Sequence, residues 1–240
     1  MTTALQTRSA IRAVFAAGAS LLALVATSGF AAPLASVDRN GAIVSVEPYA
    51  PNIVRVTIAV DRALADAPPG DGPNATPDPT GWTHASTAGS DVFTSPAISL
   101  TVKAEPWPKA PTQMQRYFAP SLPHVGLVVR GADGHTIAEM TGWEMAPAEV
   151  NGEKTFHVGA RFAVQPGEHY YGLGQNQEGV LDLKGRTIDC QHYYDAPAGE
   201  SVCVPFMVTN KGYGIVWDNA SATTVSPGLN DSTHWQSKVG

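Results

Sequence analysis

The sequence predicts an all-β protein, an antiparallel sandwich or barrel built from many short strands. Apolar and polar residues alternate with a period of two over 53–60, 97–103 and 155–164, as they do in strands that bury one face. The 23 glycines and 19 prolines suit frequent turns between strands. After the first 31 residues no segment shows the period of an amphipathic helix, so a helical fold is excluded.

Residues 1–31 are predicted to be a signal peptide. Arg8 and Arg12 precede the apolar run 13–26, and small residues follow it up to Ala31, which is the three-part pattern of a secretory signal. The alternative is an uncleaved membrane anchor, but the run is shorter than the ~20 residues needed to span a bilayer. We therefore expect an exported protein, periplasmic or secreted, with no membrane attachment after cleavage.

The first strands of the mature chain are expected at 42–47 and 53–60, where Val54, Val56 and Ile58 share one side. The following stretch 66–79 contains five prolines and cannot form a central strand, because proline donates no ladder hydrogen bond. A domain boundary there would leave too few residues before it to build a core. Residues 37–240 are therefore expected to form one domain, with 66–79 as a surface loop.

The later strands are expected on either side of short turns. Gly131–Gly134 contains the Asp-Gly pair typical of a hairpin turn, and Asn210–Gly212 is a second short turn. Thr155–Val164 alternates most clearly, with His157 and Arg161 on the polar side. The strands predicted over this half of the chain are 97–103, 125–130, 135–140, 155–164, 187–194, 201–209 and 213–218.

The two cysteines lie on the strands 187–194 and 201–209, on either side of an expected turn at 195–199. Cys190 and Cys203 are nearly equidistant from this turn, so an antiparallel hairpin would place them opposite each other. An exported protein can form the disulfide. The alternative is two buried thiols that pack as small apolar side chains.

The tip of the same hairpin gathers Gln191, Tyr193 and Asp195. Aromatic rings beside amide and carboxylate groups suit sugars, which present apolar faces and hydroxyl rims. The alternative is an ordinary polar loop tip, and the residues by themselves favour that interpretation.

Composition and spacing argue against several other kinds of site. The net charge of −6 excludes a basic nucleic-acid surface, and two cysteines exclude a multi-cysteine zinc site. The seven histidines show no metal-ligand spacing, and no Gly-x-Ser-x-Gly motif is present. Gly172–Gly174 resembles a phosphate loop only faintly and is better explained as a tight bend. We therefore expect no cofactor and no metal.

Two segments resemble consecutive blocks of the N-terminal domain of glycoside hydrolase family 31, in particular its bacterial α-xylosidase and α-glucosidase members. They are YGLGQNQEGVLDLKGR at 171–186 and VPFMVTNKGYGIVWDN at 204–219. Their order and spacing fit the family, although the segment between the two cysteines is longer than in the xylosidase-like group. This resemblance implies an antiparallel β-sandwich of the galactose-mutarotase-like kind, placed ahead of a catalytic (β/α)₈ barrel.

The resemblance also implies a function. Family members are retaining α-glycosidases that use two barrel aspartates, one as nucleophile and one as acid/base, and no block of this chain resembles either motif. The chain is thus expected to be a carbohydrate-binding, substrate-gating domain, truncated before its barrel and inactive alone, with a carbohydrate substrate and the barrel in cis as partners. A sandwich loop in the family offers an Asp to the bound sugar, which makes Asp195 the candidate, with Gln191 or Tyr193 as alternatives.

Two other functions stay open on the sequence. One is a free-standing carbohydrate-binding module, for which a pre-organised cleft on the isolated domain would argue. The other is a mutarotase-like enzyme that uses its own His and Glu. The block 171–186 favours the glycosidase domain over the mutarotase.

Overall fold

The computed structural model describes residues 33–68, 75–104, 107, 126–175, 179–190 and 202–240. Over these residues the chain is built almost wholly of antiparallel strands, with one four-residue helix, α1 (Arg62–Ala65). Among them no helix is long and apolar enough to cross a membrane. The predicted all-β antiparallel fold is confirmed.

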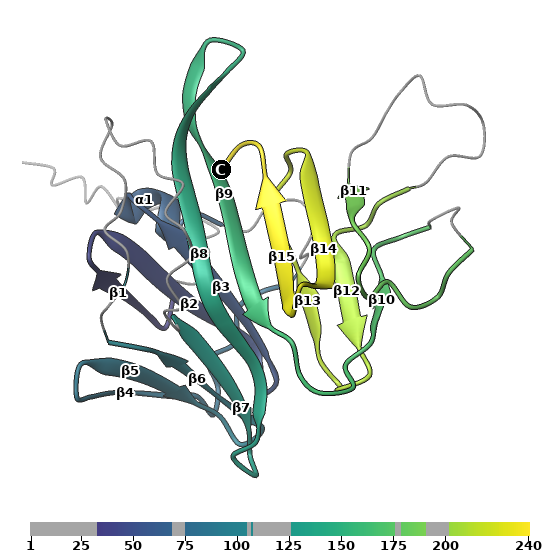
Figure 1. Cartoon of the computed structure of the whole chain (residues 1–240). Helices are drawn as coiled ribbons and strands as arrows, with labels where there is room; N and C mark the ends of the chain where they lie inside the picture. Colours follow the sequence, from purple (N-terminus) through teal and green to yellow (C-terminus); the bar gives the residue numbers. More distant parts are fainter. Residues whose placement is uncertain (1–32, 69–74, 105–106, 108–125, 176–178, 191–201) are drawn as a thin grey trace, which may run out of the picture.

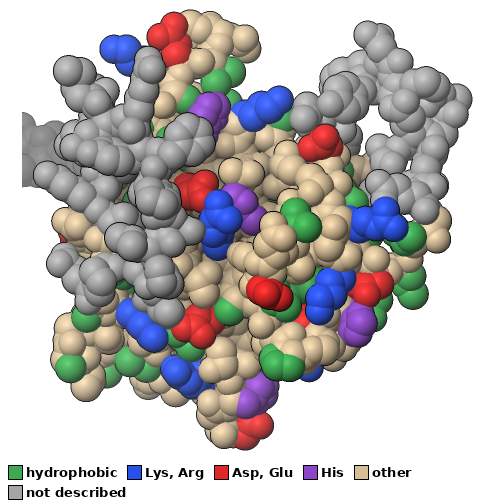
Figure 2. Space-filling model, viewed as in Figure 1, with side chains coloured by type: hydrophobic (Ala, Val, Ile, Leu, Met, Phe, Trp, Pro, Cys, Tyr) green, Lys and Arg blue, Asp and Glu red, His purple; other side chains and the backbone are tan. Residues whose placement is uncertain are grey.

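One large sheet organises the molecule (Figure 1). Its nine strands, in spatial order, are β11 (Ile188–Cys190), β14 (Thr223–Leu229), β15 (Ser232–Ser237), β9 (Glu153–Ala163), β8 (Thr136–Val150), β7 (Leu127–Gly131), β6 (Ile98–Val102), β5 (Ser90–Thr94) and β4 (Thr83–Thr87). The β8–β9 hairpin is its longest part and lies between the two halves of the sheet. Strands β8, β9, β15 and β14 present one face to the viewer, which Figure 2 shows with its side chains.

Two smaller antiparallel sheets of three strands each complete the sandwich. The first contains β1 (Ala35–Arg39), β2 (Ala42–Ala50) and β3 (Ile53–Ala59), and the second contains β10 (Tyr170–Gly172), β12 (Phe206–Thr209) and β13 (Gly214–Val216). Each packs its apolar side against one half of the large sheet, so the molecule has two adjoining apolar clusters.

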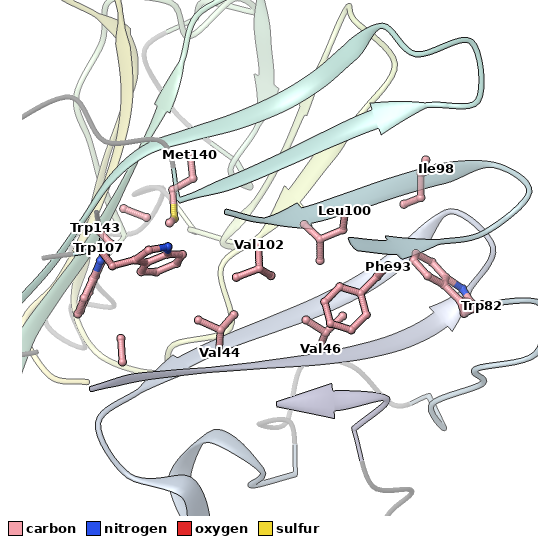
Figure 3. Close-up of a cluster of buried hydrophobic side chains, with 12 residues drawn as sticks. Val44, Val46, Trp82, Phe93, Ile98, Leu100, Val102, Trp107, Met140 and Trp143 are labelled. Carbon is pink, nitrogen blue, oxygen red and sulfur yellow. The ribbon is translucent and has the colours of Figure 1, made fainter. Parts of the chain in front are cut away.

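The first cluster joins β2 to strands β5, β6 and β8. Val44 and Val46 of β2 face Leu100 and Val102 of β6 in Figure 3, and Phe93 is buried beside them. All five side chains are at most 1% exposed, and burying an aliphatic or aromatic side chain of this size contributes roughly 1.5–3 kcal/mol. The period-two pattern of 97–103 therefore identified a true core strand.

The second cluster joins the β10–β12–β13 sheet to β11, β14 and β15. Tyr170, Leu173 and Met207 pack against Val225 and Trp235, and all five are fully buried. Both clusters use the same face of the large sheet, because the buried residues form one register row across it: Ile188, Val225, Trp235, Ala160 and Trp143.

Some strands, or parts of strands, were not predicted because the sequence marks them by their turn residues and not by alternation of apolar and polar residues. Asn151 and Gly152 have φ of 53° and 84°, as a type I′ hairpin turn requires, and they let β8 run on to Val150 instead of ending near Met140 as predicted. Asn40–Gly41 plays the same part between β1 and β2. The strands without any prediction are β1, β4, β5, β10, β14 and β15.

The predicted hairpin of strands 187–194 and 201–209 is wrong for the described residues. β11 pairs with β14 of the large sheet, whereas β12 pairs with β10 and β13 of a small one. Ile188 faces the second cluster together with Val225, its register partner. Distance from a turn cannot reveal that a more distant strand offers this apolar partner.

A buried ion pair links the first small sheet to the large one. The Arg39 guanidinium on β1 donates to the Asp91 carboxylate on β5 and to the carbonyl oxygen of Lys103. Nε2 of His84 lies 2.7 Å from the other Asp91 oxygen. Burial raises the pKa of Asp91, but the hydrogen bonds from Arg39 and His84 outweigh it and hold this pKa below its usual range.

We predict that Asp91→Asn lowers the free energy of unfolding by ~3–5 kcal/mol at neutral pH, because it leaves the Arg39 charge buried without its partner. Urea denaturation followed by tryptophan fluorescence measures the change. Asp133→Asn is the matched control: Asp133 is exposed in the β7–β8 turn, and its loss should cost no more than about 1 kcal/mol. Equal effects of the two substitutions would show that the buried pair does not join the sheets.

Candidate functional site

The predicted sugar-contacting residues Gln191, Tyr193 and Asp195 lie outside the described residues. The structure instead describes the two flanks from which the segment 191–201 leaves and returns. One flank is β11, which ends at Cys190, and the other begins at Val202. The described part of the site consists of these flanks and of the residues that hold them.

A disulfide joins the two flanks. Cys190 and Cys203 are bonded, and their Cα atoms lie 5.0 Å apart. Because Cys190 belongs to the large sheet and Val202 forms a bridge to Gln175, next to the β10 bend, the bond ties the large sheet to the second small sheet. Both ends of the segment 191–201 are thus held at one point on the edge of the sandwich.

The motif Gly172-Leu173-Gly174 forms the bend that positions the second flank. All three residues lie in the left-handed region, with φ of 100°, 58° and 84°. Leu173 is fully buried in the second cluster, and its backbone N–H donates to the carbonyl oxygen of Phe206 at 2.8 Å. Burial of its side chain offsets the ~1–2 kcal/mol that this conformation costs a residue with a Cβ. The interpretation of the motif as a tight bend agrees with this geometry.

Gly174 allows the backbone of the second flank to come close. A Cβ on Gly174 would lie 2.0 Å from the carbonyl oxygen of Val202 and 2.7 Å from the nitrogen of Val204. Gln175 and Val202 exchange both backbone hydrogen bonds, at 2.8 and 3.0 Å. The glycine is therefore needed where two backbones touch, directly beside Cys203.

A buried carboxylate lies next to the strand that leads into the bend at Gly172–Gly174. Glu168 is fully buried and accepts hydrogen bonds from Tyr170 at 2.9 Å, Tyr213 at 2.6 Å and the backbone nitrogen of Gln165 at 2.8 Å. Burial and the neighbouring carboxylate raise the pKa of both phenols. Three donors satisfy the carboxylate, as a buried charge requires, and connect β10 to the start of β13.

Asp182 shapes the other half of the block 171–186. One carboxylate oxygen accepts from the backbone nitrogens of Tyr170 and Lys184, both at 3.1 Å, and the other lies 2.6 Å from Nδ1 of His169. Burial raises the pKa of Asp182, but the hydrogen bond with His169 and the two backbone hydrogen bonds together lower it. The residues of this block that the structure describes thus serve mainly to shape the chain.

The described part of the chain holds no group of three or more His, Cys, Asp or Glu residues placed to bind a metal ion. Sequence reasoning missed Glu168 and Asp182, since neither has a neighbour in sequence that reveals its partners. Some donors are near in sequence, such as Tyr170 for Glu168 and Lys184 for Asp182, but Tyr213 and His169 reach these carboxylates only in the folded chain.

Comparison with known proteins assigns the chain to a family. The model of the glycosyl hydrolase 31 N-terminal galactose mutarotase-like domain matches residues 43–225, which is most of the chain. The chain belongs to this family.

Two curated relatives share parts of the family 31 domain. An uncharacterized family 31 glucosidase of Pseudescherichia vulneris is 34% identical over 84 residues, and an alpha-xylosidase of Saccharolobus solfataricus is 32% identical over 90 residues. These matches cover 35% and 34% of this chain but only 15% and 12% of the relatives. Both relatives are thus far longer than the region they share with this chain.

The fold also matches a solved structure of the family. The α-xylosidase of Xanthomonas citri superposes with a TM-score of 0.63 at 23% sequence identity, and the match covers 80% of this chain and 19% of the other. At this identity the likeness concerns the fold alone, and it confirms the mutarotase-like sandwich that the resemblance implied.

We predict that Gly174→Ala destabilises the family 31 domain more than Gly185→Ala. Both glycines have positive φ, of 84° and 74°, but an added Cβ meets backbone only at Gly174 and nothing within 4 Å at Gly185. Gly185→Ala should cost ~1–2 kcal/mol for its conformation, and Gly174→Ala a further ~1–3 kcal/mol for the overlap. Chemical denaturation of both variants measures the difference in the free energy of unfolding. Equal decreases in the two variants would show that the close approach of the Val202 backbone to Gly174 does not matter for stability.

A second prediction concerns Tyr170 and Tyr213. Their phenols should stay protonated in the folded protein well above pH 10.0, the usual pKa of tyrosine, whereas the unfolded chain releases these protons near that pH. The stability that they confer is therefore present below pH 10 and lost as the pH rises above it. Ultraviolet titration should show two of the seven tyrosines ionising only on unfolding.

The matched variant is Glu168→Gln, which removes the charge but keeps the side chain's shape. It should lower the pKa of both phenols, since the carboxylate is one cause of their shift. An unchanged titration in this variant, or seven tyrosines that ionise together in the folded protein, would contradict the assigned network.

Proposed function

We propose that this chain is the substrate-facing β-sandwich of an exported retaining α-glycosidase, and that the carboxylates which cleave the glycosidic bond belong to a (β/α)₈ barrel of the complete protein. The observation that carries the proposal is the family match over residues 43–225 together with the fold. The names of both curated relatives, a glucosidase and an alpha-xylosidase, support an α-glucoside or α-xyloside as substrate.

An apolar surface beside the disulfide supports the barrel as a partner in cis. Val202, Val204, Phe206 and Val216 are 44–56% exposed, and Phe206 and Val216 are register partners on β12 and β13. Apolar patches of this kind on a sheet face commonly mark a surface that another domain covers. The barrel of the complete protein would cover this patch, next to the origin of the segment 191–201.

The anchored segment supports substrate gating. The disulfide fixes both flanks of the segment 191–201 at one edge of the sandwich, and groups held in place lose less entropy when they bind a ligand. Asp195, with Gln191 or Tyr193, is our candidate for the sugar contact. A carboxylate there would accept hydrogen bonds from sugar hydroxyls.

Export follows from the proposed signal peptide at 1–31. The disulfide is consistent with an oxidising compartment, where such bonds persist. We propose that the mature chain begins near Ala32 and acts in the periplasm or outside the cell. N-terminal sequencing of the exported protein tests this, and an intact Met1 recovered from the cytoplasm would contradict it.

Kinetics of the complete protein test the gating role. Asp195→Ala should reduce kcat/KM on aryl α-xylosides or α-glucosides by roughly 10–100-fold, since a hydrogen bond to a charged group contributes about 1.5–3 kcal/mol. The melting temperature should stay unchanged. Asp133→Ala, in an exposed turn of the same domain, is the control. Wild-type kinetics in Asp195→Ala would exclude this residue from the sugar site.

The 240-residue chain alone should not hydrolyse these substrates, because retaining hydrolysis needs two carboxyl groups about 5–5.5 Å apart across the scissile bond and we place both in the barrel. Turnover above background that a single substitution within residues 37–240 abolishes would contradict the proposal. It would favour a domain with its own His and Glu chemistry instead.

A further inference from the structure

The outer face of the large sheet carries two adjoining rows of mostly polar residues. One register row runs from Asp189 through Thr224, Gln236 and Gly159 to Glu144, across β11, β14, β15, β9 and β8. The next row places Ser226, His234 and Arg161 side by side. We call the seven polar residues of these rows the outer band: Glu144, Arg161, Asp189, Thr224, Ser226, His234 and Gln236.

The period of two fixes which way the outer band points. Each strand alternates its side chains between the two faces, and the row one residue along, from Ile188 to Trp143, lies in the core. Both three-stranded sheets pack on that core face, so among the described residues no further layer covers the band. In Figure 2 side chains of both charges and histidine meet near the centre of this face.

Glu144 is held in place by its neighbours, but one of its carboxylate oxygens can still accept hydrogen bonds. Its Oε1 accepts from Nε and Nη2 of Arg161 at 3.0 and 2.8 Å and lies 3.5 Å from Nε2 of His234. These two neighbours lower the pKa of Glu144 to about 2, so the group is an ionised acceptor at physiological pH. Its Oε2 has no partner within the part of the chain that the structure describes.

Two further members of the band have unused hydrogen-bonding groups. Gln236 is exposed, and its side-chain amide bonds to none of the described residues, which leaves a donor and an acceptor free. Asp189 accepts from the Thr224 hydroxyl at 2.9 Å through Oδ1, and its Oδ2 has no partner among the described residues. Fixed acceptors thus lie near both ends of the first row, with a free amide between them.

The chemistry of the band selects its ligand. Arg161 is neutralised by Glu144, so the band lacks the unpaired cations that bind phosphates of a nucleic acid. None of the large exposed apolar side chains is a member of it, so it lacks the apolar centre of a protein interface. Free carboxylate and amide groups in a row match an uncharged chain of hydroxyl groups, which is a glycan.

We propose that the outer band binds an extended stretch of carbohydrate through residues other than those of the segment 191–201. Five strands spaced ~4.8 Å apart place the ends of the first row ~19 Å apart, which leaves room for several sugar units. The proposal rests on the proposed function in one respect, that the complete protein acts on carbohydrate. It adds a second surface that holds parts of a long substrate away from the bond that is cleaved.

Affinity electrophoresis of the 240-residue chain in native gels that contain dextran or xyloglucan tests the proposal. At least one polysaccharide should retard the wild-type chain. Gln236→Ala should weaken binding about 2–10-fold, as expected for one lost hydrogen bond, and Gln236→Ala with Glu144→Gln about tenfold or more. Lys154→Ala, on the exposed turn end of β9, is the control and should bind like the wild type. Thermal unfolding verifies that each variant is folded.

Each other outcome overturns the proposal. If folded band variants bind like the control while Asp195→Ala loses binding, carbohydrate meets the segment 191–201 alone, and the proposed function stands without the band. If neither polysaccharide retards the wild-type chain, the band does not bind glycan. The kinetics of Asp195→Ala in the complete protein then decide the proposed function separately.

Discussion

The structure depends on the register of the nine-stranded sheet, and above all on the pairing of β8 with β9. This register places Trp143 beside Ala160 in the core and Glu144 beside Gly159 on the outer face. Since side chains alternate between the two faces along the regular part of the β8–β9 pairing, a slip of one residue there would exchange the two faces. The same register thus determines both where the small sheets pack and which polar groups remain for a ligand.

The family motifs act through this framework rather than as reacting groups. Gly174 lets the backbone of Val202 lie against Gln175, and the disulfide then fixes that flank to β11. The segment 191–201 therefore leaves from a point where two sheets are bonded together. The motif thus helps to fix the point at which this segment returns to the sandwich.

Sequence reasoning predicted the fold class and several core strands, because Leu100 and Val102, or Ala160 and Phe162, show the alternation that half-burial imposes. It failed where a strand is too short to show alternation, as in β10, and where the deciding contact is distant in sequence, as in the pairing of Ile188 with Val225. The roles of Glu168 and Glu144 could not be predicted, because each depends on partners that only the fold supplies. Gln191, Tyr193 and Asp195 remain predictions.

The most direct test of the account is a nuclear magnetic resonance titration of the ¹⁵N-labelled 240-residue chain with isomaltotriose and with a xyloglucan oligosaccharide. We expect shifts of the Gln236 side-chain amide and of signals from β11, β15 and the segment 191–201, while the signals of Val44 and Val46 in β2 stay in place. Shifts confined to the β1–β3 sheet, or none with either sugar at millimolar concentration, would contradict a carbohydrate-facing role for this domain.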